Sequence, residues 1–256
     1  MKSLKLYISK LLASFGYGLY SRKRFGVVSV FRDTPPSRLN LLSLAIRALI
    51  TDGFSPYVVQ VGASDGISND PLHSVIDRHK LSGLLVEPEP LSFSELQRNY
   101  ANSKNVVLEN CAVSSTSGQL KMYRCAGEDG RLLNKRQLTT CQIEHLLAHG
   151  VKENEIETIT VPCLTFGDLK RKHNIHRIDV LQVDVEGNDD IVVRAALSLI
   201  PLPRVIHFEH FHIPSDRKNN LLLEMHIRGY EFAHTGIDTL AVLGEHIPTE
   251  GLSANF

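Results

Sequence analysis

A short apolar segment that leads into a glycine-rich turn constrains the fold of this chain more than any other feature. A strand is expected over Tyr57–Val61, and the turn Gly62–Gly66 follows it directly. In open α/β sheets, such a turn connects a strand to a helix and lets the backbone approach a bound nucleotide. The spacing differs from the G-x-G-x-x-G pattern of dinucleotide enzymes, because Ser64 stands where the second glycine would be. The turn therefore predicts a nucleotide-like ligand, with a plain strand-to-helix connection as the alternative.

Strand-length and helix-length segments alternate along the rest of the chain. Strands are expected at 57–61, 84–86, 106–108, 179–183 and 204–208, and helices at 68–80, 91–101, 166–173, 189–199 and 219–228. Such apolar strands, separated by helices, predict a parallel sheet with helices on both faces and an α/β fold class. Gly229–Ala233 and Thr239–Leu243 then predict an antiparallel hairpin at the end of the chain.

One segment interrupts the alternation, and we interpret it as an insertion. Extra strands are expected at 119–124 and 157–163, and the polar segment between them, about 125–156, contains one expected helix at 140–149. Insertions over the active end of a sheet usually carry specificity. We therefore expect this insertion to lie over one end of the sheet and to shape a ligand site.

Residues 1–53 are expected to form a helical extension ahead of a main domain at 54–256. The first 32 residues hold seven Lys or Arg and no acid, and apolar residues between Leu4 and Phe15 recur at helical spacing. This pattern predicts a helix that either makes a peripheral contact with an anionic membrane surface or packs on its own domain. A second helix is expected to end near Gly53.

Composition excludes several classes of protein. Lys and Arg together number 28, as do Asp and Glu, so the overall charge predicts no nucleic-acid partner. No apolar run approaches the roughly 18 residues that span a bilayer. The four cysteines form no C-x-x-C pair, which argues against a zinc ribbon, and they indicate reduced thiols in a cytoplasmic protein.

Glu87 stands at the expected end of the second strand, 25 positions after Gly62. A carboxylate there can accept hydrogen bonds from both hydroxyls of a ribose, and Pro88 ends the strand so that the side chain faces the cleft. The alternative is a solvated loop acid, and the glycine turn upstream favours ribose binding.

Two further acids follow the strand at 179–183. Asp184 and Glu186 lie directly before a glycine, at the edge of an open sheet where ligands bind. Asn188 or Asp189 can cap the next helix, but capping does not explain the two preceding acids. This segment therefore predicts functional carboxylates.

Histidines gather at the end of the last parallel strand, in the segment His207–His212. Alternation places His207 and Glu209 on one face of the strand, and His210 and His212 on the other. Imidazoles and a carboxylate suit zinc or iron. However, such residues without helical spacing more often mark a polar strand end, so no metal ligand is predicted.

Taken together and in order, six segments resemble the FkbM family of S-adenosylmethionine-dependent methyltransferases. They read VQVGASDG, GLLVEPEPLSFSELQRNY, VVLENCAVSSTSG, VPCLTFGDL, IDVLQVDVEGND and RVIHFEH, and they extend from about Tyr57 to His212. The resemblance implies the Rossmann-like class I methyltransferase fold, with a mostly parallel seven-stranded sheet whose last strand is antiparallel. It also implies S-adenosyl-L-methionine as the cofactor.

The resemblance further implies roles for individual residues. The amino-acid end of the cofactor is lined by Gly62, Ala63, Asp65 and Gly66, the ribose is bound by Glu87 beside Pro88, the adenine lies near Cys111 and Ala112, and the methyl-transfer cleft is faced by Asp184 and Glu186. Many methyltransferases open the first motif with an acid, whereas this chain has Gln60. Any contact assigned to that position is weaker for this reason.

Methyl transfer requires alignment of the two reactants and, with an alcohol acceptor, a base that removes the hydroxyl proton. The sulfonium is already activated, and alignment of the reactants can contribute about 7–11 kcal/mol. An alcohol is a poor nucleophile, so loss of its proton during attack helps. As the base we expect Asp184 or His210 first, with Glu186 and His212 as further candidates.

The sequence therefore predicts an S-adenosylmethionine-dependent O-methyltransferase. From the resemblance, its acceptor is a small molecule or glycan: a hydroxyl of a sugar, glycan or glycolipid, or of a secondary metabolite. A nicotinamide-dependent oxidoreductase is the alternative from another enzyme class, because the turn and the ribose acid also suit it. A non-catalytic Rossmann-like binding module, recruited to membranes by the basic N-terminus, is the non-enzymatic alternative.

Overall fold

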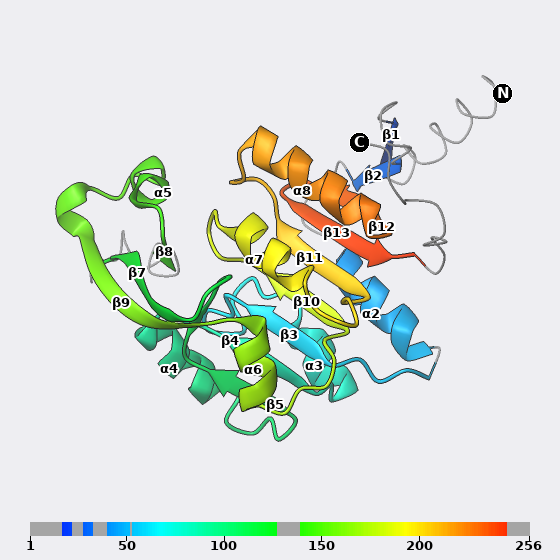
Figure 1. Ribbon diagram of the computed structural model, residues 1–256, viewed down its shortest axis with the longest axis horizontal. Helices are drawn as coiled ribbons and strands as arrows, with labels where there is room; N and C mark the ends of the chain where they lie inside the picture. Colours follow the sequence, from blue (N-terminus) through cyan, green and yellow to red (C-terminus); the bar gives the residue numbers. More distant parts are fainter. Residues whose placement is uncertain (1–16, 22–27, 33–39, 52, 127–138, 245–256) are drawn as a thin grey trace.

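The structure is a computed structural model of the chain, and it describes residues 17–21, 28–32, 40–51, 53–126 and 139–244. A seven-stranded sheet with helices on both faces forms its centre, and a four-stranded sheet extends from one side (Figure 1). The α/β class predicted from the sequence is confirmed.

Strand order in the main sheet is β12-β13-β11-β10-β3-β4-β5. The strands are β3 (Val58–Val61), β4 (Gly83–Val86), β5 (Val106–Glu109), β10 (Val180–Val183), β11 (Val205–Glu209), β12 (Tyr230–Thr235) and β13 (Asp238–Leu243). From β5 to β11 all neighbours are parallel, whereas β13 runs antiparallel to both β11 and β12. The mostly parallel sheet with an antiparallel last strand is confirmed, as is the C-terminal hairpin.

Apolar layers fix the sheet between two sets of helices. One face is covered by α2 (Leu41–Thr51), α3 (His73–His79) and α4 (Pro90–Asn99), and the other by α6 (Phe166–Lys172), α7 (Asp189–Ala196) and α8 (Ser215–Ile227). Because successive strand residues point to opposite faces, Val58 packs in the first layer and Val59 in the second. The central strands are therefore buried along their whole length.

α3 is shorter than the helix that the sequence predicts at 68–80. Asp70 Oδ1 accepts hydrogen bonds from the backbone N–H groups of Leu72 and His73, at 2.6 and 3.1 Å. These bonds satisfy donors at the start of the helix, which begins at His73. The segment ahead of it stays a loop and borders the site described below.

The insertion forms the smaller sheet, in the order β6-β9-β7-β8. Its elements are β6 (Ala112–Val113), β7 (Gly118–Cys125), β8 (Thr139–Thr140), α5 (Ile143–Ala148), the short helix η2 (Glu153–Glu155) and β9 (Ile156–Leu164). The predicted extra strands and helix are confirmed as β7, β9 and α5, while residues 127–138 lie outside the described chain. The Thr140 hydroxyl donates to the carbonyl oxygen of Glu186 at 2.8 Å, which places this unit over the carboxyl end of β10.

The prediction of a helical extension over residues 1–53 is only partly correct. β1 (Tyr17–Ser21) and β2 (Val28–Arg32) form an antiparallel hairpin, and β2 lies near β12 (Figure 1). Both strands are rich in β-branched and aromatic residues, which favour extended chain. α2 is the predicted second helix, whereas the helix predicted between Leu4 and Phe15 lies outside the described residues. Among the helices described, none is both long and apolar enough to cross a membrane.

Candidate active site

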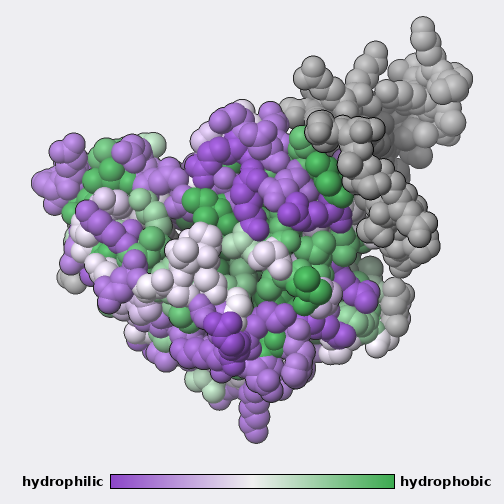
Figure 2. Space-filling model, in the orientation of Figure 1, coloured by the Kyte–Doolittle hydropathy of each residue, from purple (hydrophilic) through white to green (hydrophobic). Residues whose placement is uncertain are grey.

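A cavity of about 300 Å³ opens at the carboxyl ends of β3, β4 and β10. Its walls come from the turn after β3, the end of β4, the loop between β10 and α7, and the smaller sheet. Figure 2 shows a recess in the surface between the part that carries α5 and the part that carries α7 and α8. This edge of an open α/β sheet is where ligands bind.

The turn Gly62–Gly66 brings the end of β3 against the end of β10. Gly62 has a φ of +82°, and its N–H donates to the Val86 carbonyl oxygen at 2.9 Å. A Cβ at Gly62 would lie 1.8 Å from the carbonyl oxygen of Asp184, so only glycine fits. Ser64 also has a positive φ, +48°. Non-glycine residues in this conformation are strained and cluster at functional sites.

Glu87 follows β4 and is buried beside the turn. Its Oε2 accepts a hydrogen bond from the Ser64 N–H and its Oε1 accepts one from the Glu89 N–H, both at 2.8 Å. Burial raises the pKa of the Glu87 carboxyl to about 7, although these two hydrogen bonds act in the opposite direction. Because a carboxylate oxygen accepts more than one hydrogen bond, Glu87 keeps acceptor capacity toward the cavity that it lines.

The loop between β10 and α7 supplies the acids of the facing wall. Asp184 is exposed in the cavity, and Glu186 Oε2 lies 2.8 Å from Nε2 of His145 on α5. Glu186 has a φ of +54°, which non-glycine residues seldom adopt. Asp189, buried at the start of α7, accepts hydrogen bonds from two backbone N–H groups of the loop at 3.3 Å. The loop is thus fixed from both of its ends.

Carboxyl groups dominate the electrostatics of this end of the sheet. The protein atoms around the cavity desolvate the Asp184 carboxyl and raise its pKa well above its usual range, although its side chain is open to the cavity, and the neighbouring acids Asp189, Glu186, Glu209 and Asp238 add to the rise. Burial also raises the pKa of Asp189 to about 7 and that of Glu209 to about 8. Within the described part of the chain, no Lys or Arg lines the cavity. The site therefore stabilises a ligand with positive charge.

Seven of the residues that the sequence predicts for the site line the cavity. They are Gly62, Ala63, Glu87, Pro88, Ala112, Asp184 and Glu186. Ala112 belongs to β6 and shares its wall with the apolar residues Val113, Leu120 and Met122. The structure thus gives the cavity an acidic end and an apolar end.

Three predicted cofactor residues lie behind the cavity instead. Asp65 accepts hydrogen bonds from the backbone N–H groups of Ile67 and Ser68, at 2.9 and 2.8 Å, and so stabilises the turn itself. Gly66 packs against α4, because a Cβ there would lie 2.4 Å from Leu96. Cys111 is fully buried in the apolar layer under α6 and α7.

His210, predicted as a base, does not line the cavity. Its Nδ1 lies 2.9 Å from the Thr239 hydroxyl oxygen, its ring contacts His234, and its N–H donates to the carbonyl oxygen of Ile237. All three partners belong to the C-terminal hairpin, because β11 ends beside β13. The structure therefore does not bring His210 together with Asp184.

Sequence reasoning missed several polar side chains of the cavity wall. Gln60, Ser64, Thr139 and Gln182 line it, and each has a buried oxygen with no hydrogen-bond partner among the described residues. Asp70 Oδ2 accepts a hydrogen bond from Gln60 at 3.1 Å, so an acid does approach the position where Gln60 replaces one. Polar residues inside otherwise apolar strands are the signal that points to them. A ligand or water bound in the cavity can supply the partner that these oxygens lack.

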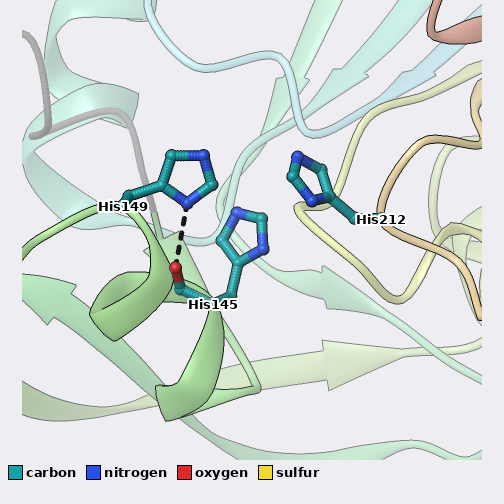
Figure 3. A group of neighbouring side chains, drawn as sticks. All are labelled: His145, His149 and His212. Atoms are coloured by element: carbon teal, nitrogen blue, oxygen red, sulfur yellow. Dashed lines mark hydrogen bonds between the residues drawn. The ribbon is translucent and has the colours of Figure 1, made fainter.

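Three histidines meet beside Glu186, in a place where the sequence analysis predicts no metal. His145 and His149 come from α5 and its C-terminal end, and His212 comes from the loop after β11 (Figure 3). Ring centroids lie 4.3 Å apart for His145 and His212, and 4.5 Å apart for His145 and His149. Of the segment His207–His212, only Glu209 and His212 join this cluster.

The strand order and the cavity at the carboxyl edge define the class I methyltransferase fold. The model of the family described as the methyltransferase FkbM domain matches residues 60–232. The chain belongs to the FkbM methyltransferase family and is a methyltransferase, a class whose methyl donor is of the S-adenosylmethionine type. No curated protein matches the chain.

Several solved structures resemble this chain in architecture. The FkbM methyltransferase from Methylobacillus flagellatus KT is 15% identical with a TM-score of 0.43, and the match covers 73% of this chain and 43% of that one. The METTL16 methyltransferase domain is 12% identical with a TM-score of 0.47, covering 86% and 74%. A precorrin-6y C5,15-methyltransferase from Geobacter metallireducens GS-15 is 10% identical with a TM-score of 0.41, covering 88% and 94%. The chain spans less than half the length of the Methylobacillus protein.

Proposed function

We propose that the protein transfers the methyl group of S-adenosylmethionine to a hydroxyl oxygen of a small-molecule or glycan acceptor. The observation that carries the proposal is the acidic cavity, which no described Lys or Arg lines. S-adenosylmethionine combines a sulfonium, an ammonium and a carboxylate, so its net charge is positive. A wall of carboxyl groups stabilises such a ligand.

The residues present fit this cofactor from end to end. Gly62 lets the turn pack against the end of β10 and lines the cavity at the expected place of the amino-acid end, and Glu87 can accept hydrogen bonds from the ribose hydroxyls. Val113 and Met122 provide an apolar surface for the adenine. The buried Ser64 hydroxyl, which has no partner among the described residues, can bond the ligand after a rotation.

A nicotinamide cofactor suits the same cavity poorly. Its pyrophosphate is anionic and normally binds backbone N–H groups of a G-x-G-x-x-G turn at a helix N-terminus. Here Ser64 replaces the second glycine, and Asp184 and Glu186 would face the phosphates. Charge therefore favours the sulfonium cofactor over the dinucleotide.

Asp184 is the group that we assign as the base for the acceptor. The bound cofactor supplies an activated methyl carbon, so the protein has to align the acceptor oxygen, exclude water and remove the hydroxyl proton. Asp184 is exposed in the cavity, and its raised pKa makes its carboxylate a stronger base than an ordinary aspartate. The hydroxyl proton passes to the Asp184 carboxylate while the oxygen–methyl bond forms. Glu186, held by His145, orients the acceptor from the same loop.

Thermal unfolding with three ligands tests the cofactor. S-adenosylmethionine and S-adenosylhomocysteine, each at 100 times its dissociation constant, should add about 2.7 kcal/mol to the free energy of unfolding. Glu87→Gln should lose most of this gain, and Glu95→Gln, an exposed change on α4, should keep it. Stabilisation by NAD alone would identify the oxidoreductase, and no response to any ligand would identify a non-catalytic binding module.

The hydroxyl acceptor needs a separate experiment. We propose a sugar, glycan, glycolipid or hydroxylated secondary metabolite on the family resemblance. The protein is incubated with cofactor that carries an isotopically labelled methyl group and with panels of such acceptors, and mass spectrometry locates the label. A labelled methyl ether is expected. A label on nitrogen or carbon alone would overturn the hydroxyl assignment and leave methyl transfer intact.

A further inference from the structure

We propose that His145, His149 and His212, together with Glu186 and Glu209, bind one divalent transition-metal ion at the edge of the cavity. The donor atoms of the three histidines all lie within 4.8 Å of one another, and so do those of Glu186, Glu209 and His212. The two groups share His212, and the Glu186–His145 contact of 2.8 Å joins them a second time. The two groups of donors are therefore neighbours at the edge of the cavity.

Three separate segments of the chain deliver these donors. His145 and His149 are four residues apart at the end of α5, so both imidazoles lie on one side of that turn (Figure 3). Glu186 and Glu209 stand at or just after the ends of the neighbouring parallel strands β10 and β11. His212 reaches the same point from the loop after β11. Convergence of ligands from a helix, a loop and strand ends is typical of a metal site.

The distances are close to those of a ligand shell. Donor atoms at about 2.0–2.2 Å from one tetrahedral ion lie roughly 3.3–3.6 Å from each other. Nε2 of His145 and Oε2 of Glu186 are 2.8 Å apart, and Nε2 of His212 and Oε1 of Glu209 are 3.7 Å apart. The first separation is that of a hydrogen bond, which an ion would replace, and the other donors of each group lie within 4.8 Å of one another, so binding requires side-chain rotations.

The orientation of His149 also suits metal binding. Its Nδ1 lies 2.9 Å from the carbonyl oxygen of His145. A carbonyl only accepts hydrogen bonds, so Nδ1 carries the proton of this bond. Metal-binding histidines commonly donate their other N–H to a backbone carbonyl in this way, which fixes both the tautomer and the ring.

The donor set selects the class of ion. Imidazole nitrogens with carboxylate oxygens suit Zn²⁺, Fe²⁺ or Co²⁺, whereas Mg²⁺ and Ca²⁺ prefer oxygen ligands alone. Neither group of donors contains a cysteine. An ion here would tie α5 of the insertion to the ends of β10 and β11. Because Glu186 also lines the cavity, an acceptor oxygen can complete the coordination, a consequence that rests on the proposed function.

Calorimetric titration tests the site. The full chain without a polyhistidine tag is treated with EDTA, dialysed and titrated with Zn²⁺, and one ion per chain is expected. His212→Ala should weaken binding by at least about 10–100-fold, the loss that even an outer-shell partner causes. His176→Ala, an exposed histidine ahead of β10, serves as the matched control and should bind as the parent chain does. Far-UV circular dichroism of each variant checks that it is folded.

Two further readouts make every outcome decisive. Co²⁺ should give ligand-field absorption without a thiolate charge-transfer band, and a thiolate band would move the site to cysteine and overturn the proposal. Unchanged Zn²⁺ affinity in folded His212→Ala, or tighter binding of Mg²⁺ than of Zn²⁺, would also overturn it. The thermal response to S-adenosylhomocysteine is measured on the same samples. Loss of that response with Zn²⁺ binding intact would overturn the proposed function and leave the metal site supported. A retained response without Zn²⁺ binding would overturn the metal site and leave the proposed function supported.

Discussion

The two sides of the cavity are built in different ways. On the cofactor side, the turn Gly62–Gly66 acts largely through its backbone, and the Ser64 N–H fixes the Glu87 carboxylate by a hydrogen bond. On the acceptor side, side chains from distant segments meet, as in the pair His145 and Glu186. Backbone geometry tolerates few substitutions, whereas an insertion can change its side chains and leave the sheet unaltered. Under the proposed function, the contrast assigns acceptor choice to α5 and the loop after β10, and cofactor binding to the main sheet with an apolar contribution from β6 and β7.

The strongest test of the cofactor side is Gly62→Ala. Its Cβ would lie 1.8 Å from the Asp184 carbonyl oxygen, so the turn and β10 must separate. We expect binding of S-adenosylhomocysteine, measured by calorimetry, to weaken by more than about 100-fold, which corresponds to roughly 2.7 kcal/mol. Gly53→Ala also has a positive φ but no atom within 4 Å of the added Cβ. It should cost only about 1–2 kcal/mol of stability and leave binding intact.

Asp184 lies between the cofactor side and the acceptor side of the cavity, and Asp184→Asn tests whether it acts in the reaction or in cofactor binding. Removal of a general base should lower the turnover number by about 10²–10⁴-fold on the acceptor found by methyl labelling. Affinity for S-adenosylhomocysteine should change only a few-fold. Asp216→Asn, an exposed change on α8, is the control. Full turnover by Asp184→Asn would remove this residue from the mechanism.

The pH dependence of ligand binding tests Glu87. Burial raises its pKa to about 7, so in the free protein the Glu87 carboxyl is mostly protonated at pH 6. Ribose hydroxyls, in contrast, favour its ionised form. Affinity for S-adenosylhomocysteine should therefore be roughly tenfold weaker at pH 6 than at pH 8. Glu87→Gln should bind more weakly with a flat profile, and a slope of the opposite sign would contradict the assignment.

The same shift in the Glu87 pKa also makes the free energy of unfolding depend on pH. Between the ordinary pKa of 4.5 and about 7, the folded chain holds a proton that the unfolded chain releases. The contribution of this group is therefore fully present below pH 4.5 and is lost as pH rises through about 7. In denaturant titrations, the free energy of unfolding of the ligand-free chain should therefore fall relative to that of Glu87→Gln as pH rises through about 7.

The smallest effect is expected on the acceptor side. Thr140→Val removes the hydrogen bond to the Glu186 carbonyl oxygen, and the free energy of unfolding should fall by about 1–2 kcal/mol. Binding of S-adenosylhomocysteine should not change, because the cofactor side keeps its backbone contacts. Thr158→Val, exposed on β9, should shift stability by less than about 0.5 kcal/mol. A large loss of cofactor binding in Thr140→Val would break the division between the two sides.

The cofactor side is the part of the site that the sequence can predict, because its residues follow strands that are recognisable in isolation. Even there, local pattern does not reveal which way a turn residue faces: Asp65 and Gly66 support the turn from behind. The sheet order follows from the same alternation of strands and helices, together with the family resemblance.

The acceptor side cannot be predicted from the sequence, because its contacts join residues that are far apart along the chain. His145 meets Glu186 across 41 positions, and no local spacing marks the pair. Alternation also fails beyond the end of β11, where His210 joins the hairpin and His212 joins α5. The rule that places residues on the two faces of a strand holds only as far as the strand extends.

The acidic wall also bears on how turnover ends. Methyl donation converts a ligand with a net positive charge into one whose charges cancel, while the carboxyl groups of the wall stay where they are. Under the proposed function, the field that attracts the donor therefore holds the spent product less firmly. The neutral product then dissociates more readily than the cationic donor, so a fresh donor replaces it. The loss of the positive charge on methyl transfer is what lowers the affinity.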